Sequence, residues 1–121
     1  MTSTVVDYAV TSIEQLREVI KAPPPDAGAV RKQLPKLDAH CRNFIAKSPF
    51  LLLATSSPDG RCDVSPRGDG QGFVLVLDDN RLVVPDRPGN RRLDYFQNII
   101  ENPHAGLIFM VPNVDETLRV N

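Results

Sequence analysis

The sequence lacks the residues on which several functional classes depend. It contains no tryptophan, two histidines and two cysteines in 121 residues. Cys41 and Cys62 stand in unrelated contexts, and the histidines are isolated, so the spacing expected of metal ligands is missing and we expect no metal site. Two cysteines without a secretory signal indicate reduced thiols in a cytoplasmic protein.

Long apolar runs and an excess of charge are also missing. The longest apolar run, residues 49–54, is too short to cross a bilayer, and the first ten residues carry no signal-peptide pattern. The 14 basic residues are balanced by 15 acidic ones. This balance argues against a general affinity for nucleic acid or anionic membranes, so we expect neither as a partner.

The familiar catalytic motifs do not occur in the sequence. There is no G-x-G-x-x-G after a strand, no P-loop and no nucleophile elbow. No pair of carboxylates is recognisable as an acid–base dyad, and the catalytic residues remain unassigned. An enzyme with this sequence would therefore depend on a cofactor for its chemistry.

The pattern of residues divides the chain near residue 35. In residues 1–35, Ile13, Leu16 and Ile20 predict a short amphipathic helix, which a proline-rich connector follows. Thr11 and Ser12 each precede a Glu or Gln by three positions, so either residue can form a capping box. We expect residues 36–121 to form the folded domain.

Residues 36–121 predict a mainly β fold with flanking helices. A helix from Lys36 is expected to bury Cys41 and Phe44 and to leave His40 partly exposed. Tight turns at 57–60 and 78–80 favour two hairpins. The predicted strands span residues 50–56, 61–67, 73–77, 81–84, 105–111 and 116–121.

The order of these strands favours a meander that forms a small β-barrel. One helix is expected between the fourth and fifth strands, with Leu93, Phe96 and Ile100 on one side. Asn102 and Pro103 end this helix, because the residue before a proline is disfavoured in the α region. The chain stops within the sixth strand, so we expect a barrel that is incomplete at its C-terminal end.

The second predicted strand carries an unusual polar face. Alternation places Asp63, Ser65 and Arg67 on one side and Val64 and Pro66 on the other. One interpretation is the solvated side of an edge strand, where proline and charge are tolerated. The other is a strip that faces a ligand. The sequence leaves both open.

A second polar feature lies in the loop before the last predicted helix. Turn-forming residues 85–90 lead into paired arginines at the expected helix start. Unpaired N–H groups and the positive end of the helix dipole favour an anion there, and guanidinium groups match phosphate oxygens. The pattern predicts a phosphate site at Arg87, Asn90, Arg91 and Arg92.

Several separated motifs resemble the pyridoxamine 5′-phosphate oxidase-like family. They are ATSSPDGRCDVSPRGD at 54–69, GFV at 72–74, VPDRPGNRR at 84–92, NP at 102–103 and ETLRVN at 116–121. The DVSPRGD and PDRPGNxR elements are similar to signatures of its bacterial FMN-dependent branch. The resemblance implies an FMN-binding split β-barrel, a homodimer with FMN at the subunit interface, and a flavin-dependent oxidoreductase of unknown substrate.

The resemblance also implies which residues bind the cofactor. Ser65, Pro66 and Arg67 would lie near the flavin ring or ribityl chain, with Asp63 and Pro85 in the same motifs. The phosphate would lie among Arg87, Asn90, Arg91 and Arg92. Family members continue past ETLRVN into further strands, so we expect this chain to lack them.

Two other functions stay open beside the oxidoreductase. PDRPGN differs from the Thr-Asn…Ser-Arg-Lys pattern of the true pyridoxamine phosphate oxidases, so their substrate is not transferred to this chain. One alternative is a non-catalytic module that stores or senses a flavin or another phosphorylated ligand. The other is a structural dimer domain whose arginines form surface ion pairs.

Overall fold

The computed structural model describes residues 9–20, 34–86 and 94–121. The chain separates into two compact units, residues 1–34 and 35–121. In the first unit, α2 (Ile13–Ile20) confirms the predicted helix, and its apolar residues are exposed. Ser12 provides the cap, because its Oγ accepts the Gln15 N–H at 3.1 Å.

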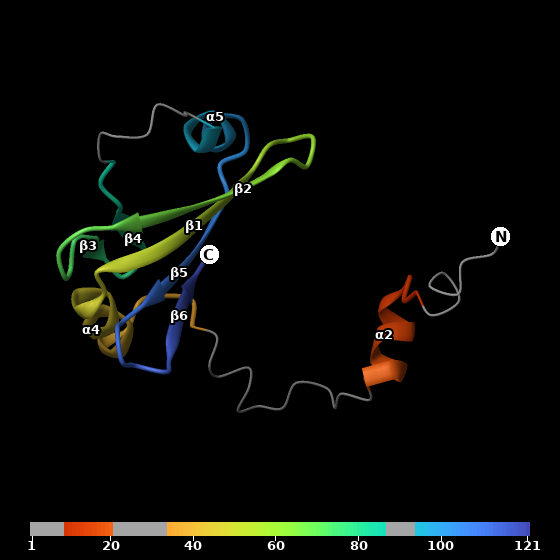
Figure 1. Ribbon diagram of the computed structural model, residues 1–121, viewed down its shortest axis with the longest axis horizontal. Helices are drawn as coiled ribbons and strands as arrows, with labels where there is room; N and C mark the ends of the chain where they lie inside the picture. Colours follow the sequence, from red (N-terminus) through yellow and green to blue (C-terminus); the bar gives the residue numbers. More distant parts are fainter. Residues whose placement is uncertain (1–8, 21–33, 87–93) are drawn as a thin grey trace. The chain divides into compact units, whose positions relative to one another are not determined.

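The second unit contains a four-stranded antiparallel sheet and a separate two-stranded sheet (Figure 1). The larger sheet has the order β2-β1-β5-β6, and the smaller one pairs β3 with β4. The predicted mainly β fold is confirmed, and the arrangement is that of a split β-barrel whose sheet is not closed. The strands are β1 (Phe50–Ser56), β2 (Cys62–Gly68), β3 (Leu75–Asp78), β4 (Arg81–Val83), β5 (Ala105–Met110) and β6 (Thr117–Val120).

The predicted meander order is wrong, because β1 lies between β2 and β5. The loop after β2 is attached to the corner between α4 (Ala39–Lys47) and β1. Within this loop, Asp69 N–H donates to Pro49 O at 3.1 Å and Gly72 N–H donates to Ser48 O at 3.1 Å. Gly72 has a φ of +71°, and a Cβ there would lie 2.9 Å from the Ala46 carbonyl oxygen. These contacts direct the chain away from the free edge of β2, so β3 pairs with β4 in a second sheet.

Helix α4 begins later than predicted. Asp38 caps it, since its carboxylate accepts the Cys41 N–H at 2.8 Å, and the helix therefore starts at Ala39 instead of Lys36. This hydrogen bond also lowers the pKa of Asp38 below its ordinary value. Cys41 and Phe44 are buried and His40 is exposed, which confirms the predicted faces.

The core lies on one face of the larger sheet. Leu51 pairs with Phe109 and Leu53 pairs with Leu107, so these side chains share that face. Phe44 and Ile45 of α4 pack against them, together with Val74 and the partly buried apolar residues of the β3–β4 hairpin. Helix and hairpin thus cover the same side of the sheet.

The opposite face of the sheet is apolar and more exposed. Leu52 pairs with Ile108, and Phe50 pairs with Met110, across β1 and β5. Phe50 is exposed, and the other three are half-buried. Val64 of β2 continues this face and is 62% exposed. We call this surface, made of Phe50, Leu52, Val64, Ile108 and Met110, the outer face.

Helix α5 (Asp94–Glu101) meets the sheet with polar residues. Asn98 Nδ2 donates to Thr55 Oγ1 at 3.1 Å, and Asn102 Nδ2, just beyond the helix, donates to Ser56 O at 3.1 Å. The predicted apolar side consists of Leu93, which lies outside the described residues, and of Phe96 and Ile100. Phe96 is 40% and Ile100 81% exposed, so this is not the side of the helix that faces β1. The two asparagine amides orient the helix, because they satisfy polar groups at the end of β1.

Candidate functional site

The polar residues of β2 lie on the core face of the sheet. Ser65 pairs with Leu53 and Arg67 pairs with Leu51, and residues that pair directly point to the same side. Asp63, Ser65 and Arg67 are half-buried, whereas Val64 and Pro66 are exposed. Of the two interpretations left open, the solvated side of an edge strand is correct only in part: β2 is an edge strand, but its polar residues lie on its less exposed side. The polar strip extends the core face to the edge of the sheet.

Arg67 is a largely enclosed charged group of this strip. Its side chain is only 15% exposed, and its Cζ lies 4.0 Å from the centroid of the Tyr95 ring. Its Nε donates to Ser65 Oγ at 3.4 Å, and its Nη1 lies 3.4 Å from Asp86 Oδ1. Both distances are at the outer limit for a hydrogen bond, and a guanidinium has five N–H donors. The group is therefore oriented by its neighbours and can still donate to a ligand.

Tyr95 connects the two charged residues of the site. Its ring lies under the Arg67 guanidinium, and its hydroxyl donates to Asp86 Oδ1. Desolvation, and next the hydrogen bond to Asp86, raise the pKa of Tyr95 above its ordinary value, so the phenol is neutral and can donate near pH 7. We call Ser65, Arg67, Asp86 and Tyr95 the Arg67 cluster.

The structure brings together only some of the residues predicted for the site. Ser65 and Arg67 belong to the Arg67 cluster, and Pro85 is half-buried immediately before Asp86. Asp63 lies further along the same strip, opposite Thr55, whereas Pro66 is opposite Leu52 on the outer face. The predicted phosphate residues lie outside the described part of the chain: Arg87, Asn90, Arg91 and Arg92.

The Arg67 cluster joins both ends of that predicted phosphate segment. Asp86 precedes it and Tyr95 follows it closely, and both contact Arg67. Sequence reasoning did not assign Tyr95 a role, because the apolar stripe of the helix was assigned to its neighbour Phe96. The only local signal was a second aromatic beside that stripe, and the two rings lie 4.1 Å apart.

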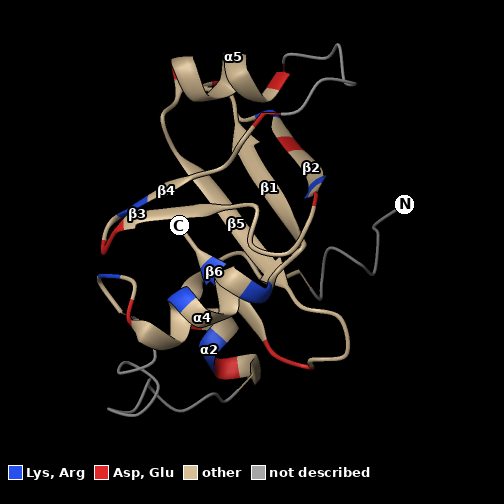
Figure 2. Ribbon diagram, turned by 90° about the vertical axis from the view of Figure 1, so that its left-hand side faces the viewer, with Lys and Arg blue, Asp and Glu red and all other residues tan. Residues whose placement is uncertain are grey.

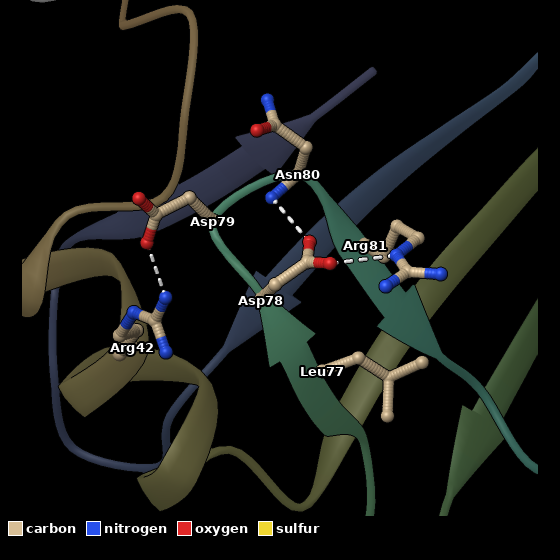
Figure 3. A pocket seen from close by; sticks show the side chains of 6 residues that line it. All are labelled: Arg42, Leu77, Asp78, Asp79, Asn80 and Arg81. Carbon is tan, nitrogen blue, oxygen red and sulfur yellow. Dashed lines mark hydrogen bonds and ion pairs between the residues drawn. The ribbon is translucent and has the colours of Figure 1, made fainter.

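A hollow at the turn between β3 and β4 has a different character (Figure 3). Arg42 of α4 pairs with Asp79, and Arg81 pairs with Asp78 at 2.6 Å. In addition, Leu37 N–H donates to Asp79 O at 2.8 Å. These charges pair with one another and connect the hairpin to α4, which is a structural role.

Charges of both signs are mixed over the second unit. Figure 2 shows acidic beside basic residues both on β2 and at the β3–β4 turn. Among residues 9–20, 34–86 and 94–121, no group of three or more His, Cys, Asp or Glu side chains could hold a metal ion. No helix in these same stretches is long and apolar enough to cross a membrane.

Comparison with known proteins identifies a family. A family model described as "Pyridoxamine 5'-phosphate oxidase" matches residues 37–121, well over half of the chain. The match includes α4, all the strands of both sheets and α5. No curated protein and no solved structure matches the chain.

Proposed function

Because this chain belongs to the pyridoxamine 5′-phosphate oxidase family, we propose that it binds FMN and acts as a flavin-dependent oxidoreductase. The family is a flavin-binding one, and the choice of FMN rests on the phosphate residues predicted from the sequence. The substrate of the true pyridoxamine phosphate oxidases is not carried over to this chain, because its PDRPGN loop differs from theirs.

The Arg67 cluster is the observation that carries this proposal. It presents a largely enclosed guanidinium, a serine hydroxyl and an aromatic ring at one edge of the sheet. Donors at the edge of an apolar core fit the polar edge of a flavin. When bound, FMN supplies the redox chemistry, and the protein binds and orients it.

We assign different parts of the cofactor to different arginines, because the charges around those arginines differ. Arg67 is paired with Asp86, so the cluster is close to neutral and suits the uncharged ring or ribityl hydroxyls. The doubly charged phosphate needs cations beyond this pair. We assign that role to Arg87, Arg91 and Arg92, with the neutral amide of Asn90 as a further hydrogen-bond donor; all four lie in the chain segment between Asp86 and Tyr95.

The outer face is the surface that we assign to a homodimer. An exposed apolar patch on a sheet marks a surface for association, and Val64, at 62% exposure, is its most exposed large residue. Val64→Asp should convert the dimer to a monomer without loss of the fold. Light scattering on the wild type and this variant tests the assignment, and a wild-type monomer at all concentrations would refute it.

The two cysteines support a cytoplasmic location. Both are unpaired, Cys41 being buried and Cys62 exposed. Exposed thiols persist in a reducing compartment, so we place the protein in the cytoplasm.

FMN titration of the purified chain tests the cofactor assignment. Flavin fluorescence should be quenched on binding, and Arg91→Ala with Arg92→Ala should strongly weaken the binding. A matched control replaces two exposed arginines elsewhere, Arg81 and Arg119, by alanine. Affinity retained in the first double variant, or lost equally in the control, would remove the phosphate assignment.

Reduction of the bound flavin separates an oxidoreductase from a binding module. We expect NADH, NADPH or an artificial electron donor to bleach the flavin absorbance anaerobically. A bound flavin that no donor reduces at a useful rate would favour the storage or sensor alternative.

A further inference from the structure

Asp86 and the proposed ligand compete for the same guanidinium. Asp86 Oδ1 lies 3.4 Å from Arg67 Nη1, which is too long for a strong ion pair. The Asp86 side chain is 54% exposed and could move closer to Arg67 by a small rotation. A closer pair would take up N–H groups that a ligand needs.

The Tyr95 hydroxyl limits this competition. It donates to the same Oδ1 atom that faces Arg67. A carboxylate oxygen that accepts from a phenol is fixed in position and is a weaker acceptor for a second donor. The ring of Tyr95 meanwhile lies against the guanidinium, 4.0 Å from its Cζ. One side chain therefore fixes both members of the ion pair.

We propose that Tyr95 is a positioning residue that keeps Arg67 available to the cofactor: its ring orients the guanidinium, and its hydroxyl restrains Asp86 from a full ion pair. This inference rests on the proposed function. Tyr95 acts through Arg67 and Asp86, and it need not touch the cofactor itself.

The two parts of Tyr95 can be separated by substitution. Tyr95→Phe removes the hydroxyl and keeps the ring, so it releases Asp86 without disturbing the stacking. Asp86→Asn in the same chain then removes the carboxylate that competes for Arg67. Loss of FMN affinity in the first variant and its recovery in the double variant is a signature that a merely structural role of Tyr95 would not produce.

FMN dissociation constants from fluorescence quenching provide the test, with apoprotein melting temperatures as the check on folding. Tyr95→Phe should weaken binding on the order of tenfold, a typical coupling between contacting side chains. Tyr95→Phe with Asp86→Asn should recover most of that loss. Ile100→Ala, at a side chain of the same helix that is 81% exposed, is the matched control and should bind like the wild type.

The outcomes separate this inference from the function on which it rests. Equal affinity in the wild type and Tyr95→Phe, or no recovery in the double variant, overturns the role of Tyr95 and leaves FMN binding intact. Failure of the wild type to bind FMN overturns the proposed function and this inference together. Tyr95→Phe keeps the ring and the packing, so the test does not depend on a variant that fails to fold.

Discussion

Arg67 lies directly opposite Leu51 in the antiparallel pair of β1 and β2, and both side chains point to the same face of the sheet. Leu51 is fully buried, whereas Arg67 reaches the edge of the core with a side chain that is 15% exposed. The arginine can thus place its aliphatic stem along apolar surface while its charged end meets Tyr95 and Asp86. This pairing explains how a charge is oriented at the edge of the core without entering it.

Substitution of Arg67 should weaken cofactor binding in two steps. Arg67→Lys keeps the charge but loses the planar fork and its stacking on Tyr95, and Arg67→Met loses the charge as well. We expect losses of about 1.5–3 kcal/mol in binding free energy for the methionine variant, the range for hydrogen bonds to charged groups, and less for lysine. Isothermal titration with FMN measures both. Arg61→Lys, at the exposed turn of the same hairpin, is the control, and an equal effect there would argue against a specific role for Arg67.

Truncation of the core should destabilise the second unit. Phe109 is fully buried between β1 and β6, so Phe109→Ala should lower the free energy of unfolding by about 3–5 kcal/mol. Ile100→Ala, at a site that is 81% exposed, should change it by less than about 0.5 kcal/mol. Urea denaturation followed by circular dichroism measures both variants. Similar losses in the two would show that burial of Phe109 is not what stabilises the fold.

The two cysteines should differ in reactivity. Cys62 is exposed, whereas Cys41 is buried, and desolvation raises the pKa of the Cys41 thiol. Since the thiolate is the reactive form, iodoacetamide should modify Cys62 first in the native protein. Peptide mass spectrometry before and after denaturation measures the order. Rapid labelling of Cys41 in the native protein would contradict the burial of this side chain on α4.

Acid should destabilise the second unit over a defined range. Backbone hydrogen bonds, from Cys41 to Asp38 and from Asn80 to Asp78, lower the pKa of these carboxyls from an ordinary value of 3.8. Because the folded-state pKa of each carboxyl lies below its unfolded-state value, the ionised carboxyl stabilises the fold fully above about pH 3.8. This stabilisation disappears as the pH falls through the folded-state pKa. The urea midpoint should therefore be steady near neutral pH and decline below about pH 4.

Asp38→Asn isolates one of these carboxyls. Asparagine can still cap α4, but it does not titrate, so the decline in acid should become shallower while stability at neutral pH changes little. Urea midpoints of the variant and the wild type should be measured from about pH 2.5 to about pH 7, which covers the range in which carboxyls titrate. An unchanged acid profile would show that Asp38 does not contribute to it.

The elements and turns of the second unit were predictable because they depend on neighbours in the sequence. Alternation in residues 61–67 placed Ser65 and Arg67 on one face, and Ser57 to Gly60 specified the turn before them, where Gly60 N–H donates to Ser57 O at 3.0 Å. The capping role of Asp38 was missed, because Leu37, which precedes the helix, already has the spacing of its apolar residues Cys41 and Phe44. Strand order was missed because the loop that ends at Gly72 is directed by backbone contacts with α4 and β1.

The sequence by itself determined the six strands of the described chain, the face of α4 that packs against the sheet, and the family. Each of these follows from spacings of a few residues or from short motifs. Only the tertiary structure decided that β1 pairs with β5, that α5 turns its asparagines to the sheet, and that Tyr95 and Asp86 meet Arg67. Those relationships join residues that are 19 to 60 positions apart in the sequence. The packing of the whole domain selects among them, and no local pattern encodes that packing.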